Sequence, residues 1–144
     1  LTKKTIINNW LHTGDLGFFD EQGRLVINGR KKDLIVTSGG DNISVQKIES
    51  LLSKEIEINQ AIIFGDNKPY LIALLVLENK KYKKSIKDIL GRINRSLNSV
   101  EKIRKFIILE KQLTYENGFL TQTQKVKRDK VFQSFKNDIE NLYN

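Results

Sequence analysis

Residues 61–77 read AIIFGDNKPYLIALLVL, two apolar runs separated by a polar turn. The turn, residues 65–69, contains a glycine, an asparagine and the chain's only proline, which favour a reversal of direction. The pattern predicts a β-hairpin. The second run, residues 71–77, is apolar without interruption, which is typical of a strand buried on both faces.

Helical segments are predicted on both sides of this hairpin. Ser44 is a good helix cap, and apolar residues recur at helical spacing after it. Ser85 and Asp88 resemble a capping box before a second helix, and apolar residues from Asp129 onward mark a terminal helix. Residues 106–109 form a further strand candidate. The alternation predicts an α+β domain, with helices packed on a small mixed or antiparallel sheet.

The first part of the chain has a different pattern of turns and short strands. A turn at residues 20–23 separates two short apolar pieces, which predicts a β-hairpin ahead of the α+β domain. A short strand at residues 33–37 then leads into a tight loop, residues 38–42, where several positions can adopt positive φ.

Composition narrows the class of protein. The 144 residues suffice for one domain with its own core. A formal net charge of +8 favours anionic partners such as phosphates, nucleotides, nucleic acid or an acidic membrane surface. The absence of cysteine excludes a disulfide scaffold and a cysteine nucleophile, and a single histidine, His12, excludes multi-histidine metal sites.

No apolar run reaches the roughly 20 residues that span a bilayer, and no signal peptide is visible. We therefore expect a cytoplasmic protein, and leave open a peripheral association of the full-length protein with a membrane. Because the chain lacks methionine altogether, we also expect it to be part of a longer protein.

Three segments contain candidate functional residues. Asp15 either bonds its own backbone in a turn or accepts two hydroxyl donors of a ligand. Residues 29–40 are either an exposed charged turn or a basic hinge beside a glycine loop that admits a ligand close to the backbone. Residues 118–128 are either a solvated face or a loop that reaches an anionic reaction centre. The cationic side chains of that loop are Lys125, Lys127 and Arg128.

Four stretches together resemble one known family: HTGDLG at 12–17, GRKKDLI at 29–35, TSGGDNISVQKIE at 37–49 and LTQTQKVKR at 120–128. In this order they are similar to the C-terminal part of AMP-forming adenylate-forming enzymes, and above all to the long-chain fatty acid–CoA ligases. The resemblance implies that residues 1–31 are the end of a large N-terminal adenylation domain and residues 32–144 a mobile C-terminal domain. We expect such a fragment to be inactive alone.

The family's reaction has two steps, and the resemblance assigns residues to both. ATP and a fatty acid give an acyl-adenylate and pyrophosphate, and coenzyme A then gives acyl-CoA and AMP. Asp15 would bind the ribose hydroxyls of ATP and AMP, with Arg30 beside the same ribose and Lys32 at the hinge. Lys125 would be the adenylation lysine, because KVKR keeps the family's Lys-x-x-Arg spacing, and Lys127 is the alternative.

The resemblance also implies where coenzyme A would bind and which substrates and metal ion the enzyme would use. Ser38, Gly39 and Gly40 would line the channel for coenzyme A, where small residues let a thiol arm pass close to the backbone. ATP and coenzyme A are expected as substrates. Mg²⁺ is expected with ATP but bound by the N-terminal domain, so this chain is expected to hold no metal.

The expected partners are the chain's own N-terminal domain, the fatty acid, ATP and coenzyme A, without nucleic acid. Two alternatives stay open. One is an acyl-AMP ligase or adenylation domain that delivers to a carrier protein. The other is a basic polyanion-binding module, which only the net charge supports.

Overall fold

A three-stranded sheet forms the centre of the computed structural model, which describes residues 6–144. The strand order is β7 (Ile58–Phe64), β8 (Leu71–Leu77) and β9 (Ile103–Leu109). β7 and β8 are antiparallel, as the hairpin pattern predicted, whereas β8 and β9 are parallel. The predicted mixed sheet is therefore confirmed.

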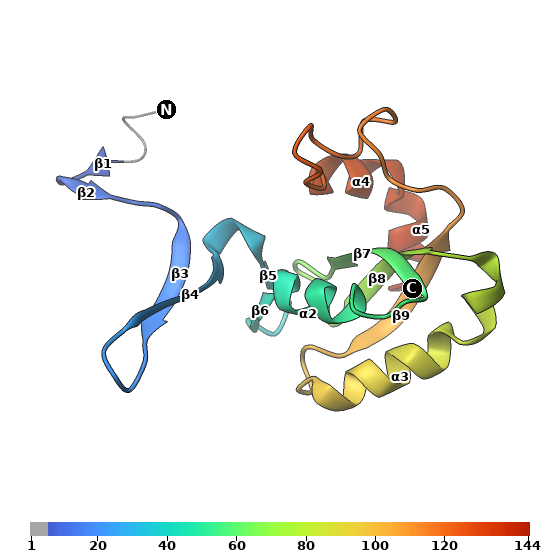
Figure 1. Ribbon diagram of the computed structural model, residues 1–144, viewed down its shortest axis with the longest axis horizontal. Helices are drawn as coiled ribbons and strands as arrows, with labels where there is room; N and C mark the ends of the chain where they lie inside the picture. Colours follow the sequence, from blue (N-terminus) through green and yellow to red (C-terminus); the bar gives the residue numbers. More distant parts are fainter. Residues whose placement is uncertain (1–5) are drawn as a thin grey trace.

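Helices cover both faces of this sheet (Figure 1). They are α2 (Val45–Leu52), α3 (Ile86–Ser96), α4 (Arg128–Ser134) and α5 (Lys136–Asn141). In β8, Leu71 and every second residue after it pack with α2 and α3, while Ile72 and every second residue after it pack with α4 and α5. Six consecutive residues of β8 are buried. The uninterrupted apolar run thus follows from cover on two sides, as predicted.

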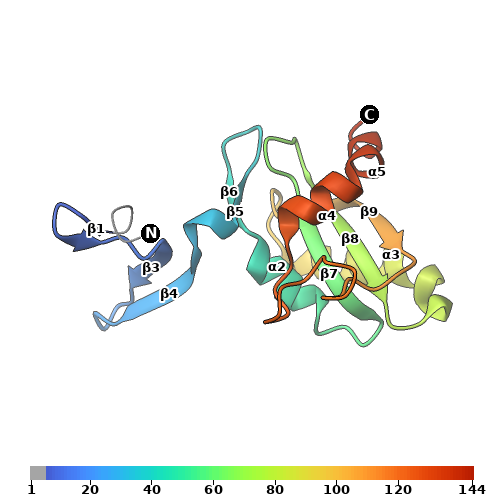
Figure 2. The same cartoon turned by 90° about the horizontal axis from the view of Figure 1, so that it is seen from above.

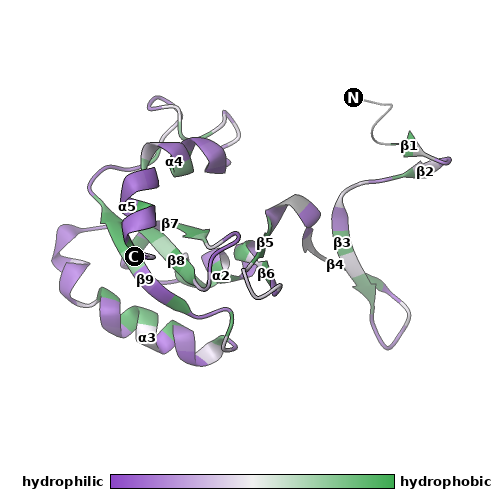
Figure 3. Ribbon diagram, turned by 180° about the vertical axis from the view of Figure 1, so that it is seen from behind, coloured by the Kyte–Doolittle hydropathy of each residue, from purple (hydrophilic) through white to green (hydrophobic). Residues whose placement is uncertain are grey.

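The same two-sided burial is visible in the hydropathy of the ribbon (Figure 3). β8 is apolar throughout, whereas one end of β9 and the outer faces of α3 and α5 are polar. The last residues of the chain are tied to the sheet, since the Tyr70 hydroxyl donates to the Leu142 carbonyl over 2.7 Å. The Tyr143 hydroxyl donates in return to the Tyr70 carbonyl over 3.2 Å.

Two details of the helices differ from the sequence prediction. Neither Ser44 nor Ser85 caps a helix through its side chain. The Ser85 hydroxyl donates instead to the carbonyl of Tyr82. The terminal helix is divided into α4 and α5 at Phe135, whose φ of −114° and ψ of 18° leave the helical region. The basic run after β8 forms a 3-10 helix, η2 (Lys80–Lys84).

Short antiparallel hairpins precede the sheet, and the first two extend away from it in two perpendicular views (Figures 1 and 2). They comprise β1 (Ile6–Ile7) with β2 (Trp10–Leu11), β3 (Asp15–Phe19) with β4 (Leu25–Arg30), and β5 (Leu34–Val36) with β6 (Asn42–Ser44). The predicted β3–β4 hairpin is confirmed, and the β1–β2 hairpin was missed. Its turn consists of Asn8 and Asn9, both at positive φ, which is the backbone of a tight hairpin turn.

Large apolar side chains of the first two hairpins are exposed, unlike those of the sheet. Trp10 is 76% exposed and Phe19 is 73% exposed. Among the described side chains of residues 6–31 there is therefore no buried core, in contrast to the two buried clusters around the sheet.

Candidate active site

Asp15 and Arg30 form an exposed ion pair at the base of the β3–β4 hairpin. They are direct partners in the strand register, and Arg30 Nε lies 3.1 Å from Asp15 Oδ1. The Asp15 backbone N–H donates to Thr13 Oγ1, also over 3.1 Å. The hairpin thus presents a carboxylate acceptor beside a guanidinium donor. This combination can bind a ligand that carries neighbouring hydroxyl groups.

One short backbone segment after Arg30 connects this hairpin to the rest of the chain. The Lys31 N–H donates to the carbonyl of Gly14 over 2.8 Å, and the chain then enters the 3-10 turn η1 (Lys31–Asp33). Lys32 is the middle residue of η1, and its side chain lies outside the described residues. Gln46 Nε2 donates to Asp33 over 3.0 Å, which attaches the far end of η1 to helix α2.

The glycine loop, residues 37–41, closes the β5–β6 hairpin. Gly40 has φ of +86°, a conformation that side chains other than glycine rarely adopt. The loop is closed by Thr37, whose hydroxyl donates to Asp41 Oδ2 over 3.0 Å and accepts from the Asp41 N–H. A Cβ on Gly39 would lie 3.3 Å from Asp41 Oδ2. The loop therefore has little room for larger residues.

The β7–β8 turn supports this glycine loop from one side. The Ser38 N–H donates to the carbonyl of Lys68 over 3.0 Å, and the Asn67 N–H donates to the carbonyl of Val36 over 2.8 Å. Asp66 Oδ1 accepts from the Val36 N–H over 3.1 Å. The turn that the sequence predicted at residues 65–69 thus positions the predicted loop at Ser38, Gly39 and Gly40.

The lysine hairpin, residues 119–127, holds Lys125 at its turn. A bridge between Leu120 and Val126 brings the two arms together. The Thr121 N–H donates to the Lys125 carbonyl over 2.8 Å, and the Lys125 N–H donates to Thr121 Oγ1 over 3.1 Å. Gln124, before the lysine, has φ of +61°. The segment expected as an irregular loop is therefore a tight hairpin.

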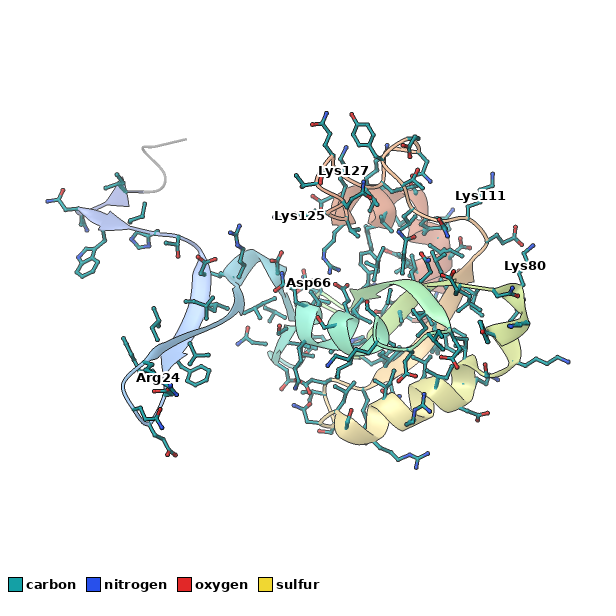
Figure 4. All side chains as sticks on the ribbon, in the orientation of Figure 1. Arg24, Asp66, Lys80, Lys111, Lys125 and Lys127 are labelled. Atoms are coloured by element: carbon teal, nitrogen blue, oxygen red, sulfur yellow. The ribbon has the colours of Figure 1, made fainter. Side chains whose placement is uncertain are left out.

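Lys125 and Lys127 are both exposed and lie beside α4 (Figure 4). Within residues 6–144, neither side chain forms an ion pair with a carboxylate. An ammonium group without an internal partner is available to an anionic ligand. No hydrogen bond or ion pair of the described residues joins these lysines to the Asp15–Arg30 pair.

Arg128 is half-buried and paired with Glu49. The expectation that the loop presents three cations to a ligand was therefore wrong for Arg128. Its Nη2 lies 2.6 Å from each carboxylate oxygen of Glu49, and its Nη1 donates to the Ile63 carbonyl over 3.0 Å. Glu49 Oε1 also accepts from the Ile63 N–H over 2.8 Å. Burial raises the pKa of the Glu49 carboxyl above its ordinary value, although the adjacent guanidinium opposes that rise.

A cleft of about 360 Å³ lies between the start of β5, the β7–β8 turn and the helices α4 and α5. Asp33, Asp66 and Lys68 contribute charges to its wall, and Arg128 borders it beside the lysine hairpin. The cleft therefore adjoins both the residues after η1 and the lysine hairpin. Among residues 6–144, no group of three or more His, Cys, Asp and Glu side chains gathers to hold a metal ion.

Comparison with known proteins identifies a family for most of the chain. Residues 32–144 match the family described as AMP-binding enzyme C-terminal domain. The chain belongs to this family. The long-chain-fatty-acid–CoA ligase FadD15 of Mycobacterium tuberculosis is 35% identical over 99% of this chain and 28% of its own length. The AMP-binding C-terminal domain and its preceding hairpins thus span little more than a quarter of that relative.

Solved structures of adenylation domains contain a part with the same fold as this chain. The A domain of carboxylic acid reductase from Segniliparus rugosus, in complex with AMP and a carboxylic acid, has a TM-score of 0.87 at 26% identity. The match covers 99% of this chain and 24% of that one. The A-PCP didomain of the same reductase, in complex with AMP, also has a TM-score of 0.87 at 26% identity, over 99% and 22% of the two chains. The predicted α+β class and the resemblance to adenylate-forming enzymes are confirmed.

Two residues of the site were not recognised in the sequence. Glu49 ends the stretch at 37–49, where its residue type alone indicates no role, and Gln60 lies in none of the four stretches. The signal for Glu49 is its place on the apolar face of α2 between Ile48 and Leu52, where a carboxylate needs a cation. Gln60 binds both backbone groups of Leu113 over 2.8 Å, and this contact has no local sequence pattern.

No helix among the described residues is long and apolar enough to cross a membrane.

Proposed function

We propose that this chain is the C-terminal part of a long-chain fatty acid–CoA ligase. Residues 1–31 would end the large N-terminal domain, and residues 32–144 would form the mobile C-terminal domain. The full-length enzyme would join ATP and a fatty acid to an acyl-adenylate, with release of pyrophosphate. The thiol of coenzyme A would then attack the acyl carbon and release AMP. The 35% identity to FadD15 over almost the whole chain supports this assignment.

The observation that carries the proposal is the presentation of Lys125. Its ammonium group is exposed at the turn of a hydrogen-bonded hairpin, without an internal carboxylate partner among residues 6–144. In adenylation the fatty acid carboxylate attacks the α-phosphorus of ATP, so two anions must approach each other. A lysine between them offsets their repulsion and stabilises the charge of the transition state. Lys127 remains the alternative for this role.

The nucleotide end of the site would be formed by Asp15 and Arg30. The free Asp15 oxygen would accept hydrogen bonds from the ribose hydroxyls of ATP and AMP, and Arg30 holds that carboxylate in place through Oδ1. ATP is thus a substrate of the full-length enzyme. Mg²⁺ would accompany ATP and would be bound by the N-terminal domain.

The second half-reaction would use a different surface of the same domain. Lys32, in the short turn η1 that joins the hairpins to the domain, would be the hinge. After rotation, Ser38, Gly39 and Gly40 would line the channel of coenzyme A. The positive φ at Gly40 and the lack of side chains there support a role in which a ligand passes close to the backbone.

Pyrophosphate exchange in the full-length enzyme tests the reaction class. We expect exchange of pyrophosphate into ATP that depends on an added fatty acid, across a panel from short to long chains. Short-chain acids and aromatic carboxylates serve as matched controls for the carboxylate alone. Exchange with all carboxylates alike, or with none, would contradict the assignment to fatty acids.

A carrier protein is the second candidate acceptor, because the A-PCP didomain of carboxylic acid reductase has the same fold. The enzyme would then transfer the acyl group to a protein-bound thiol rather than to coenzyme A. Competition between coenzyme A and a phosphopantetheinyl carrier protein in one turnover assay separates the two. We expect acyl-CoA as the main product, and preferential acylation of the carrier would favour the second candidate.

A further inference from the structure

Glu49 and Arg128 form a closed network across three elements of the domain. Glu49 lies on α2, Arg128 is the first residue of α4, and Ile63 on β7 lies between them. The guanidinium donates to both carboxylate oxygens at 2.6 Å and to the Ile63 carbonyl at 3.0 Å. The carboxylate in turn accepts the Ile63 N–H. The network therefore links α2, β7 and α4 through both side chains and the backbone of Ile63.

The two charges are largely removed from water. The Glu49 side chain is 19% exposed and the Arg128 side chain 30%. A buried ion pair loses much of its Coulombic attraction to the cost of desolvating both ions, so an apolar pair of the same size stabilises a fold as well or better. The raised pKa of Glu49 agrees with that cost. A geometric role explains the pair better than stability does.

Arg128 directly follows the second arm of the lysine hairpin and anchors it. It follows Lys125 by three residues, and the backbone between them is held by the Leu120–Val126 bridge and by the Lys127 N–H, which donates to the Phe119 carbonyl over 2.8 Å. Fixing Arg128 therefore fixes the position of the lysine turn relative to α2 and β7.

Strand β7 also holds the segment that precedes the lysine hairpin. Gln60 on β7 receives the Leu113 N–H and donates to the Leu113 carbonyl, both over 2.8 Å. Both ends of the segment that carries Lys125 are thus attached to β7, one by the Gln60 amide and the other by the hydrogen bond from Arg128 to the Ile63 carbonyl. The amide contact lies several residues farther from the lysine than the ion pair does.

We propose that the Glu49–Arg128 pair is a positioning device for adenylation: it holds the lysine hairpin against α2 and β7 so that Lys125 meets the reacting anions. The inference rests on the proposed function. Neither residue touches substrate in this role. The pair acts only in the half-reaction that uses Lys125, and thioester formation does not need it.

Another ion pair of the same helix provides a matched control. Lys47 on α2 lies 2.8 Å from Glu101, and the Glu101 side chain is even less exposed than that of Glu49. Glu101 also accepts from the Asn98 N–H, just as Glu49 accepts a backbone N–H. This pair attaches α2 to the turn before β9 and has no contact with the lysine hairpin.

The test compares Glu49→Gln with Glu101→Gln in the full-length enzyme. Glutamine keeps the shape of glutamate but places an NH₂ group or a neutral oxygen against the guanidinium. We expect Glu49→Gln to lower acyl-adenylate formation about 10- to 100-fold, the effect of a displacement near 1 Å. Thioester formation from supplied acyl-adenylate is expected to stay within about twofold. Glu101→Gln is expected to leave the ratio of the two half-reactions unchanged.

Arg128→Lys extends the test to a variant that keeps the positive charge but loses the planar fork. It is expected to lower adenylation less than Glu49→Gln does, and again not thioester formation. It also tests the pair if Glu49→Gln fails to fold. An equal loss of both half-reactions, or no loss of either, would overturn the proposal.

Amide hydrogen exchange provides a readout independent of activity. In Glu49→Gln the amides of Gln124, Lys125 and Lys127 are expected to exchange faster, while those of β8 keep their protection. Unchanged exchange in the hairpin would overturn the positioning role. A wild-type enzyme without carboxylate-dependent pyrophosphate exchange would instead contradict the proposed function, so the two failures are distinguishable.

Discussion

The glycine loop and the lysine hairpin are two short turns on one domain, and they are held in opposite ways. Hydrogen bonds from the β7–β8 turn to the backbone groups of Ser38 and Val36 support the glycine loop. A side-chain ion pair supports the lysine hairpin, through Glu49 and Arg128. Hydrogen bonds to the loop backbone leave a surface that is free of large side chains. The ion pair instead positions the long cationic side chain of Lys125.

This difference matches the two chemical tasks that we propose. A thiol arm needs space close to the backbone, and Gly39 and Gly40 leave that space. Two reacting anions need a charge at a defined place, and Lys125 supplies it from a braced turn. Mutations should therefore separate the two tasks, with the largest effect expected at the lysine. The smallest expected effect is the pH dependence of stability at the Glu49–Arg128 pair.

Replacing Lys125 by alanine should have the largest effect. We expect pyrophosphate exchange to fall about 10²- to 10³-fold, the usual result of removing one well-placed donor to a developing charge. Thioester formation from supplied acyl-adenylate should be largely spared. Rapid-quench measurement of the two half-reactions checks both parts.

Two further lysine variants sharpen this result. Lys127→Ala tests the alternative assignment, and a larger loss there than in Lys125→Ala would transfer the catalytic role to Lys127. Lys111→Ala, an exposed lysine after β9 (Figure 4), controls for the loss of one positive charge.

Gly39→Leu should produce the opposite pattern. A Cβ at this position already lies 3.3 Å from Asp41 Oδ2, so a leucine must fill the loop surface or displace Asp41. We expect adenylation to continue while thioester formation falls about tenfold or more, because a leucine side chain would obstruct the thiol arm and a loss of about 1.4 kcal/mol of transition-state stabilisation lowers a rate tenfold. Accumulation of acyl-adenylate in the presence of coenzyme A is the measurement.

Gly91→Leu is the matched control for that variant. Gly91 lies in α3, and a Cβ there meets nothing within 4 Å. It should leave the ratio of the two half-reactions unchanged. An equal loss of adenylation in Gly39→Leu would break the distinction between the two turns.

The pH dependence of stability should be the smallest effect, and it tests the buried pair directly. Because burial raises the pKa of Glu49, the folded state holds this proton more tightly than the unfolded state. The free energy of unfolding of the wild type, relative to Glu49→Gln, should therefore decrease as pH rises from the ordinary glutamate value of 4.5 through the raised value. Below 4.5 the difference should be constant.

Urea unfolding of both proteins across this pH range measures the effect. The charged groups that act on Glu49 are Arg128 on α4, which favours the ionised form, and Asp33 in η1, which disfavours it. A relative stability that increases with pH would mean that attraction to Arg128 outweighs burial. The ion pair would then be a source of stability rather than a positioning device.

Much of the fold was predictable because its signals are local. The β7–β8 hairpin and helix α2 follow from apolar spacing and from turn residues at 65–69. The parallel pairing of β8 with β9 was not predictable, since residues about 30 apart in sequence carry no mark of their pairing. The break between α4 and α5 at Phe135 also has no Gly or Pro to signal it.

The candidate site was likewise only partly predictable from the sequence. Each motif could be found in the sequence, because Asp15, Gly39 and Lys125 lie in short stretches with a characteristic order. The partners of those motifs could not. Asp66 supports the glycine loop from 30 residues away, and Glu49 holds Arg128 across 79 residues.

The sequence by itself determined which residues could meet the anions, which loop could stay free of side chains and which segments form helices or strands. Each of these depends on residue type and on spacing over a few positions. Only the tertiary structure decided that Arg128 turns inward while Lys125 remains exposed, although both belong to one basic run. The reason is that a guanidinium is buried where a carboxylate and a carbonyl from other elements converge, and folding alone brings those groups together.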